Sequence, residues 1–225
     1  MAARDDKAGH RKRLRDRFFR DPEALPDYEL LEMLLCMARP RGDTKPVAKR
    51  LLRRFGSLGA VLAQDRAALA EVDGVNEASA AALIAVDEAA CRMLRQKAAE
   101  RPILSSWDRL LDYVVARMGN AKREEFRVLF LDSKNVLIKD EALQRGTVDE
   151  TAIYPREVVK RALELHASAF IMVHNHPSGD PTPSRADIDM TREVAEAGKA
   201  LGITLHDHLI IGGRRHASFK SLGLL

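Results

Sequence analysis

Two histidines and an aspartate form the most informative group of residues in this 225-residue sequence. His174 and His176 follow the apolar run 169–173, and Asp187 comes after a loop rich in Pro and Gly. In an extended chain alternate side chains share a face, so the two imidazoles should point the same way, about 6.5 to 7 Å apart. The loop can return the carboxylate towards them. Two nitrogens and one oxygen would leave a fourth tetrahedral position for water, which is the arrangement of catalytic zinc.

The same residues also have a purely structural interpretation. Ser184 and Asp187 have the spacing of a capping box, with Ser at the N-cap of a helix and an acid in its first turn. The histidines could then be polar residues at the end of a strand. However, this arrangement desolvates several polar groups, which is costly without a ligand. We therefore predict one divalent ion per chain, zinc or alternatively Mn2+, bound by His174, His176 and Asp187.

The elements that must position these residues fall into two halves. A helical pattern of Ala, Leu and Arg stops near residues 100–102, and β-branched alternation begins shortly afterwards. We expect an all-α domain over residues 1–101 and an α/β domain over residues 102–225. In the first half, helices are expected at 10–20, 27–38, 44–55, 57–63, 65–70 and 77–97.

In the second half, helices and strands alternate. Helices are expected from Ser105 or Ser106 to about 118, at 155–167 and at 185–201, and strands at 126–131, 135–138, 169–173 and 203–211. This order indicates an α/β or α+β domain. The predicted metal ligands then lie at the end of one buried strand and in the first turn of the helix that follows it.

The composition favours a globular, cytosolic protein. Hydrophobic residues make up 46% of the chain, which is enough for a packed core. No stretch approaches the roughly 18 apolar residues of a membrane-spanning helix, and the N-terminus lacks the apolar run of a secretory signal. Cys36 and Cys91 each lie in an apolar helical pattern, so we expect buried thiols and no disulfide. We predict a cytoplasmic location without a membrane partner.

The spacing of the site resembles a known signature. His-x-His, seven further residues and Ser-x-x-Asp match the JAMM motif of JAB/MPN metalloprotease-like domains. Four short sequence segments resemble those of the bacterial RadC family, historically labelled DNA repair proteins: residues 174–179, 145–147, 155–158 and 207–212. The resemblance covers nearly the whole chain. It implies a JAB/MPN (cytidine-deaminase-like) fold for residues 102–225, preceded by a helix-hairpin-helix region.

The resemblance also implies roles for individual residues. In JAMM enzymes a glutamate near the start of an early strand acts as the general base, and the matching position here is Glu124, with Glu125 as its rival. Ser184 matches the serine that hydrogen-bonds the attacking water or the oxyanion. We expect Asp207 and His208 to support the site or to be structural, and His166 to lie on the surface.

Residues 69–83 have the shape of a helix-hairpin-helix element, which resembles a DNA-phosphate-binding hairpin. Gly74 and Asn76 are the candidates for phosphate contact, although the family hairpin has a second Gly where this chain has Asn76. Acidic residues near this hairpin would repel a phosphate. Residues 1–20 instead carry eight Lys or Arg against three Asp, a basic cluster that could contact a phosphate backbone. DNA and a docked protein both stay open as partners of this half.

Three functions follow for the whole chain. The first is a metal-dependent hydrolase, a metalloprotease-like enzyme that cleaves a peptide or isopeptide amide. The alternatives are a DNA-directed metallonuclease and a non-catalytic DNA-associated scaffold linked to repair or recombination. The sequence leaves the physiological substrate and the oligomeric state open.

Overall fold

The computed structural model describes residues 2–145 and 153–225, with side chains for 9–143 and 153–225. Gly146 and Thr147, part of one family-like motif, lie outside the described residues. The chain divides into two compact units, Met1–Ala90 and Cys91–Leu225. The division falls inside one long helix, ahead of residues 101 and 102, where the sequence places the domain boundary.

The first unit is helical, as predicted. It contains α1 (Ala2–Arg20), α2 (Asp27–Ala38), α3 (Lys45–Phe55), α4 (Leu58–Leu62), α5 (Arg66–Ala70) and the start of α6 (Glu77–Ala99). Ser57 and Asp65 cap α4 and α5, because each side chain accepts a hydrogen bond from a backbone N–H in the first turn. Apolar side chains of α2 to α6 form the core of this unit.

The second unit is built on one mixed sheet of five strands in the order β2-β1-β3-β4-β5. The strands are β1 (Glu125–Leu131), β2 (Leu137–Arg145), β3 (Ala169–Asn175), β4 (Thr204–Gly212) and β5 (Arg215–Ser218). Strand β1 is antiparallel to both β2 and β3, β3 is parallel to β4, and β4 is antiparallel to β5. The α/β prediction for this half is therefore confirmed.

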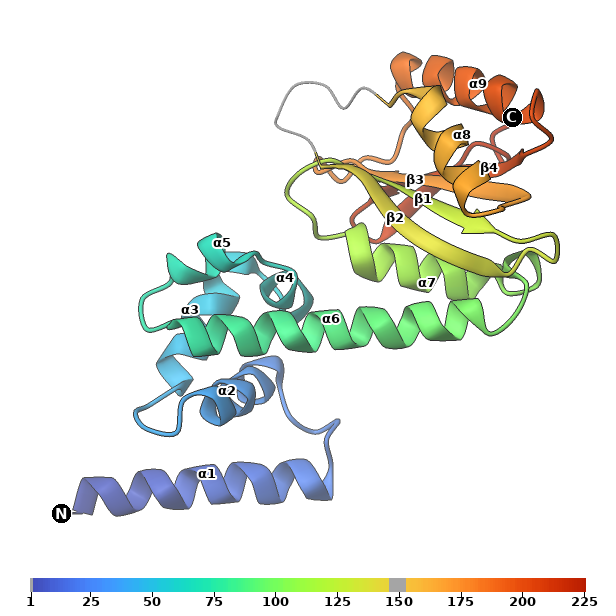
Figure 1. Cartoon of the computed structure of the whole chain (residues 1–225). Helices are drawn as coiled ribbons and strands as arrows, with labels where there is room; N and C mark the ends of the chain where they lie inside the picture. The colour runs from blue at the N-terminus through green and yellow to red at the C-terminus, as the bar shows by residue number, and fades with distance from the viewer. Residues whose placement is uncertain (1, 146–152) are drawn as a thin grey trace. The chain divides into compact units, whose positions relative to one another are not determined.

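Helices cover both faces of the sheet (Figure 1). The short 3-10 helix η1 (Ile103–Ser105) leads into α7 (Trp107–Met118), which packs on one face. Helices α8 (Pro155–Glu164) and α9 (Arg185–Lys199) pack on the other. Because strand residues alternate, Ile171 and Val173 of β3 belong to the α7 core, whereas Phe170 and Met172 belong to the α8 and α9 core. His174 continues this second set.

Two strands differ from the sequence prediction. Strand β2 runs to Arg145, well beyond the expected end at residue 138, and β5 was not expected. Asp140 and Glu141 interrupt the apolar pattern of β2 in the sequence. In the structure each has a charged partner, since Arg127 bonds to Asp140 and Arg161 bonds to Glu141. Among the described residues, none of the helices combines the length and apolar character needed to cross a membrane.

Candidate metal centre

The three predicted ligands come together at the carboxyl end of β3. The Nε2 atoms of His174 and His176 lie 3.0 Å apart. The Nε2 atom of His174 lies 3.2 Å from Oδ1 of Asp187, and that of His176 lies 3.7 Å from Oδ2. His176 continues the strand beyond β3, because its N–H donates to the carbonyl of Ile211 at 2.8 Å. Both imidazoles therefore face the first turn of α9.

The loop after β3 fixes the tautomer of His176. Its Nδ1 atom lies 2.8 Å from the backbone carbonyl of Asp180. A carbonyl oxygen can only accept, so Nδ1 carries the proton and donates it. In the neutral ring, Nε2 then presents a lone pair towards His174 and Asp187. Asp180 itself is held by the Thr182 side chain, which donates to its carboxylate at 2.8 Å.

A chain of three side chains fixes the tautomer of His174. The Thr191 hydroxyl donates its single proton to the carbonyl of Asp187 at 2.5 Å, so it must accept from Nδ1 of His208, 2.6 Å away. Nε2 of His208 is then the acceptor for Nδ1–H of His174, at 2.8 Å. Burial holds the pKa of His208 well below its ordinary value, so this ring is neutral. In its neutral form, His174 therefore presents the Nε2 lone pair as well.

Ser184 and Asp187 form the predicted capping box of α9. The backbone N–H and hydroxyl of Ser184 both donate to Oδ2 of Asp187, at 2.7 and 2.6 Å, and the hydroxyl accepts from the N–H of Asp187. These bonds orient the carboxylate so that Oδ1 lies closest to His174. The structural interpretation and the metal-binding interpretation of this motif are thus compatible, because one set of bonds serves both.

The spacing of the three ligand atoms fits a zinc ion. Ligand atoms about 2.0 to 2.1 Å from a tetrahedral zinc ion lie about 3.3 Å from one another. The two Nε2 atoms lie 3.0 Å apart, and they lie 3.2 and 3.7 Å from different oxygens of the Asp187 carboxylate. All three residues offer ligand atoms within 4.8 Å of one another, and the described residues contain no second cluster of this kind. The site thus offers an open-sided set of two imidazoles and one carboxylate.

Charge at the site also favours a cation. Burial alone would raise the pKa of Asp187, but hydrogen bonds to His174 and His176 hold it well below the ordinary range, so the carboxylate is ionised. The hydrogen bond with Asp187 raises the pKa of His176, and the charge of Glu124 adds to that rise. A positive charge, whether a proton or a metal ion, is therefore stabilised between these groups.

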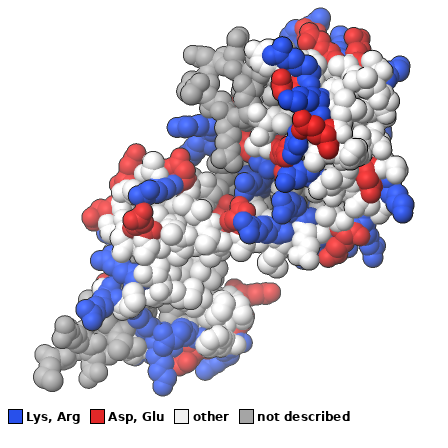
Figure 2. Space-filling view, in the orientation of Figure 1, with Lys and Arg blue, Asp and Glu red and all other residues white. Residues whose placement is uncertain are grey.

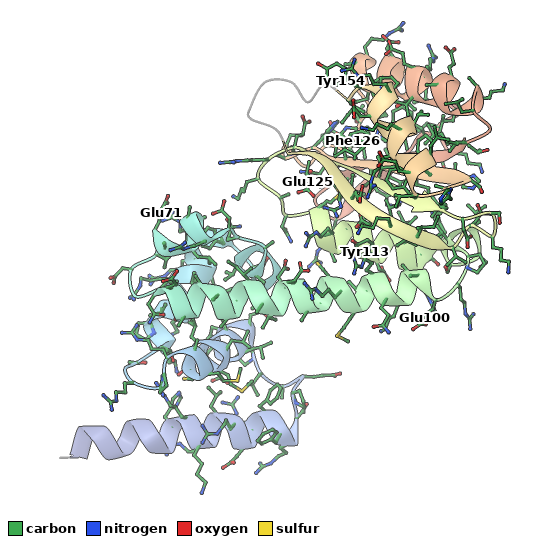
Figure 3. All side chains as sticks on the ribbon, in the orientation of Figure 1. Glu71, Glu100, Tyr113, Glu125, Phe126 and Tyr154 are labelled. Carbon is green, nitrogen blue, oxygen red and sulfur yellow. The ribbon has the colours of Figure 1, made fainter. Side chains whose placement is uncertain are left out.

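The two candidate bases lie on different sides of the sheet. Glu124 directly precedes β1, is exposed, and is close enough to His176 to influence its pKa. Glu125 instead pairs with Arg127 on the α7 side, where Arg127 also bonds to Asp140. Its neighbour Phe126, which is labelled with Glu125 in Figure 3, stacks on His174, and the ring centroids lie 5.9 Å apart. Glu125 thus faces away from the predicted ligands, whereas Glu124, just before β1, is the one of the two whose charge acts on His176.

Both residues proposed to contact DNA in the predicted hairpin, Gly74 and Asn76, have structural roles. Gly74 has a φ of +87°, and a Cβ there would lie 2.8 Å from Val47. The side chain of Asn76 accepts a hydrogen bond from the N–H of Ser79 at 2.9 Å and so caps α6. Contact of Gly74 and Asn76 with DNA stays a prediction.

The acidic side chains that would repel a DNA phosphate at this hairpin form ion pairs with arginines. Each of three acidic side chains has an arginine partner in the same unit: Glu71 with Arg54, Asp73 with Arg50 and Glu77 with Arg66. Lys and Arg alternate with Asp and Glu over the face shown in Figure 2, and Glu71 is labelled in Figure 3. Exposed pairs of this kind are weak, so a phosphate could compete for the arginines.

His208 was expected to support the site or to be structural, whereas Thr191 was not identified from the sequence. His208 of β4 and Thr191 of α9 are fully buried and connect one predicted ligand to the other. In the sequence, His208 stood out because it follows an acid within an apolar strand. That acid, Asp207, supports this region by accepting hydrogen bonds from the Ser218 hydroxyl and from the N–H of Lys220. His166 is exposed, as expected.

The chain matches known proteins over most of its length. Residues 104–224 match the family model described as the RadC-like JAB domain. A protein of Rhodobacter capsulatus named "UPF0758 protein" is 59% identical over 213 residues, which is 94% of this chain and the full length of that relative.

Proposed function

This chain belongs to the RadC family, and on that premise we propose that it is a metal-dependent hydrolase, with zinc as the metal and a peptide or isopeptide amide as the substrate. One observation carries the proposal. The chain's own hydrogen bonds engage Nδ1 of His174 and of His176, so that each Nε2 atom, unprotonated when the ring is neutral, lies beside the ionised carboxylate of Asp187. Three ligands of this kind are typical of catalytic zinc sites, whereas structural sites are usually closed by four.

The chemistry divides between the ion and the chain. A zinc ion held by these ligands would polarise a carbonyl group and lower the pKa of water to about 7. Glu124 would take the proton of the attacking water and pass it to the leaving nitrogen, because its carboxylate lies near His176 and is open to solvent. Phe126 covers one face of His174 and keeps water away from that side.

Ser184 would support the oxyanion only after a change of rotamer. Its hydroxyl proton goes to Asp187 in this structure. A serine rotamer change costs little at an exposed position, and Ser184 is exposed. Once turned, the hydroxyl could donate to the oxygen of a substrate carbonyl as negative charge develops there.

A direct assay tests the proposal. The zinc-loaded full chain is incubated with a peptide library, with isopeptide-linked peptides, and with duplex and single-stranded DNA, alongside protein treated with a chelator. We expect zinc-dependent cleavage of an amide. Cleavage of DNA alone would replace the proposal with a metallonuclease, and duplex binding without any hydrolysis would replace it with a scaffold.

DNA contact through the hairpin of Gly74 and Asn76 is a second candidate function, compatible with the first. It is favoured by the arginine pairing of the hairpin acids, which reduces their repulsion of a phosphate. Binding would rely on backbone amides at the start of α6 and would not select a base sequence. Duplex affinity should then fall steeply as salt rises.

A further inference from the structure

Asn175 stands between the two predicted histidine ligands, but its side chain lies on the other side of the sheet. It is the last residue of β3 and is 1% exposed. A buried amide must use its donor and its acceptor, since leaving either unpaired is costly. The hydrogen-bond partners of the Asn175 amide therefore indicate the role of this side chain.

Both groups of the Asn175 amide bond to the backbone around Glu124. Its Oδ1 atom accepts from the N–H of Glu125 at 2.9 Å. Its Nδ2 atom donates to the carbonyl of Arg123 at 3.1 Å, with a longer contact of 3.5 Å to Ala121. One side chain thus grips the residues immediately before and after Glu124.

These bonds lie just beyond the point where the pairing of β1 with β3 ends. The register of β1 with β3 ends at the pair Phe126 and His174. Glu124 lies beyond that pair and is exposed, so its own side chain has little packing to fix it. The side chain of Asn175 therefore links residues 123–125 to β3 beyond the last backbone pair of β1 with β3.

We propose that Asn175 is a positioning residue that fixes the backbone on both sides of Glu124 and so holds its carboxylate beside the ligands His174 and His176. The part of this inference that concerns catalysis rests on the proposed function. An asparagine suits the task because one planar group accepts on one side and donates on the other. An aspartate would keep the acceptor for Glu125 but would turn an oxygen towards the carbonyl of Arg123.

The first arm of the test measures the grip without using activity. Amide hydrogen exchange over residues 121–125 is compared in the zinc-loaded wild type, Asn175→Ala and the control Asn135→Ala. Asn135 is a useful match because its side chain also bonds across elements, to His206, and its φ of +61° makes Ala unfavourable there. We expect exchange of the Glu125 N–H to rise about tenfold or more in Asn175→Ala only.

The second arm asks whether the grip acts through Glu124. On the amide substrate that the wild type cleaves, Asn175→Ala should lower kcat by about 10- to 100-fold with KM nearly unchanged. Asn175→Asp should give a smaller loss. Combined with Glu124→Gln, Asn175→Ala should cause no further loss, because the base it positions is already gone.

Each result decides between the alternatives. Unchanged exchange over residues 121–125 in Asn175→Ala, or a loss of kcat that multiplies with that of Glu124→Gln, would overturn the inference. Faster exchange together with a non-additive loss supports it. If the wild type cleaves nothing, the proposed function fails, and the exchange arm alone then decides whether Asn175 holds this segment.

Discussion

When both rings are neutral, the lone pairs on Nε2 of His174 and Nε2 of His176 face each other across 3.0 Å. Each proton is committed elsewhere, because His176 donates from Nδ1 to a backbone carbonyl and His174 donates from Nδ1 to His208. Two lone pairs at this distance repel unless a positive charge lies between them. The ionised Asp187 attracts such a charge from a third side. The local hydrogen bonds thus prepare the site for a cation.

His208 should control how tightly that cation binds. Replacing it with Ala removes the acceptor that orients the ring of His174, so we expect zinc affinity to fall by about 10- to 100-fold. Thr191→Val, which keeps the shape but removes the hydroxyl, should weaken binding in the same direction. The measurement is a competition titration of the metal-free protein against a zinc chelator.

His206→Ala is the matched control for this experiment. His206 lies on the same strand but bonds to Asn135. Its loss should leave zinc affinity unchanged within error. Equal affinity in His208→Ala and the wild type would show that the buried imidazole does not orient His174.

The two neighbouring glutamates should behave differently in catalysis. Glu124→Gln should lower kcat by about 100- to 10,000-fold, because the amide cannot accept the proton of water. Glu125→Gln should keep kcat within a few-fold, since Glu125 pairs with Arg127 on the other side of the sheet. The assay is zinc-dependent amide cleavage, with thermal melting to show that both variants are folded. The opposite ranking would reject Glu124 as the base.

The ion pair between β2 and α8 predicts a pH dependence of stability. Arg161 donates two hydrogen bonds of 2.6 Å to Glu141, and these lower the pKa of Glu141. The folded state then binds the proton less readily than the unfolded chain. This stabilisation is therefore present at neutral pH and is lost as the pH falls below the unfolded value of about 4.3.

Thermal melting of Glu141→Gln checks this prediction. Its melting temperature should be below that of the wild type at pH 7, and the difference should shrink as the solution is acidified. Glu193→Gln, an exposed change on α9, should show no such trend. A difference that stays constant from pH 7 to acid would contradict the sign of the shift.

Asn76 allows the cap of α6 to be separated from DNA contact. Asn76→Ala should lower the free energy of unfolding by about 1 kcal/mol, whereas Asn76→Asp should keep the cap and the stability. If the hairpin binds duplex DNA, Asn76→Asp should weaken that binding, because the new charge repels phosphate. Unchanged DNA affinity in Asn76→Asp, measured at low salt, would exclude the start of α6 as the contact.

The geometry of the predicted ligands could be inferred because it depends on short stretches of chain. His174 and His176 share a face by strand alternation, and Ser184 and Asp187 meet within one helical turn. These relationships require no knowledge of distant elements. The family resemblance supplied the role of Glu124, and the pairing of Glu125 with Arg127 gives a physical reason to prefer Glu124.

The contacts made by the supporting residues could not be inferred in the same way. His208 comes from β4 and reaches His174 only because β4 pairs in parallel with β3. The full length of β2 was hidden because Asp140 and Glu141 interrupt its apolar pattern, and their partners, Arg127 and Arg161, lie in other elements. Tertiary contacts of this kind override local patterns.

The zinc content of the untagged protein tests the central claim most directly. Elemental analysis of the purified wild type should give about one zinc ion per chain, and His174→Ala, His176→Ala and Asp187→Ala should each lose most of it. His166→Asn, a change at an exposed histidine with positive φ, should keep the metal. Metal-free wild type that does not take up zinc, or a His174→Ala variant that binds it as well, would contradict the account.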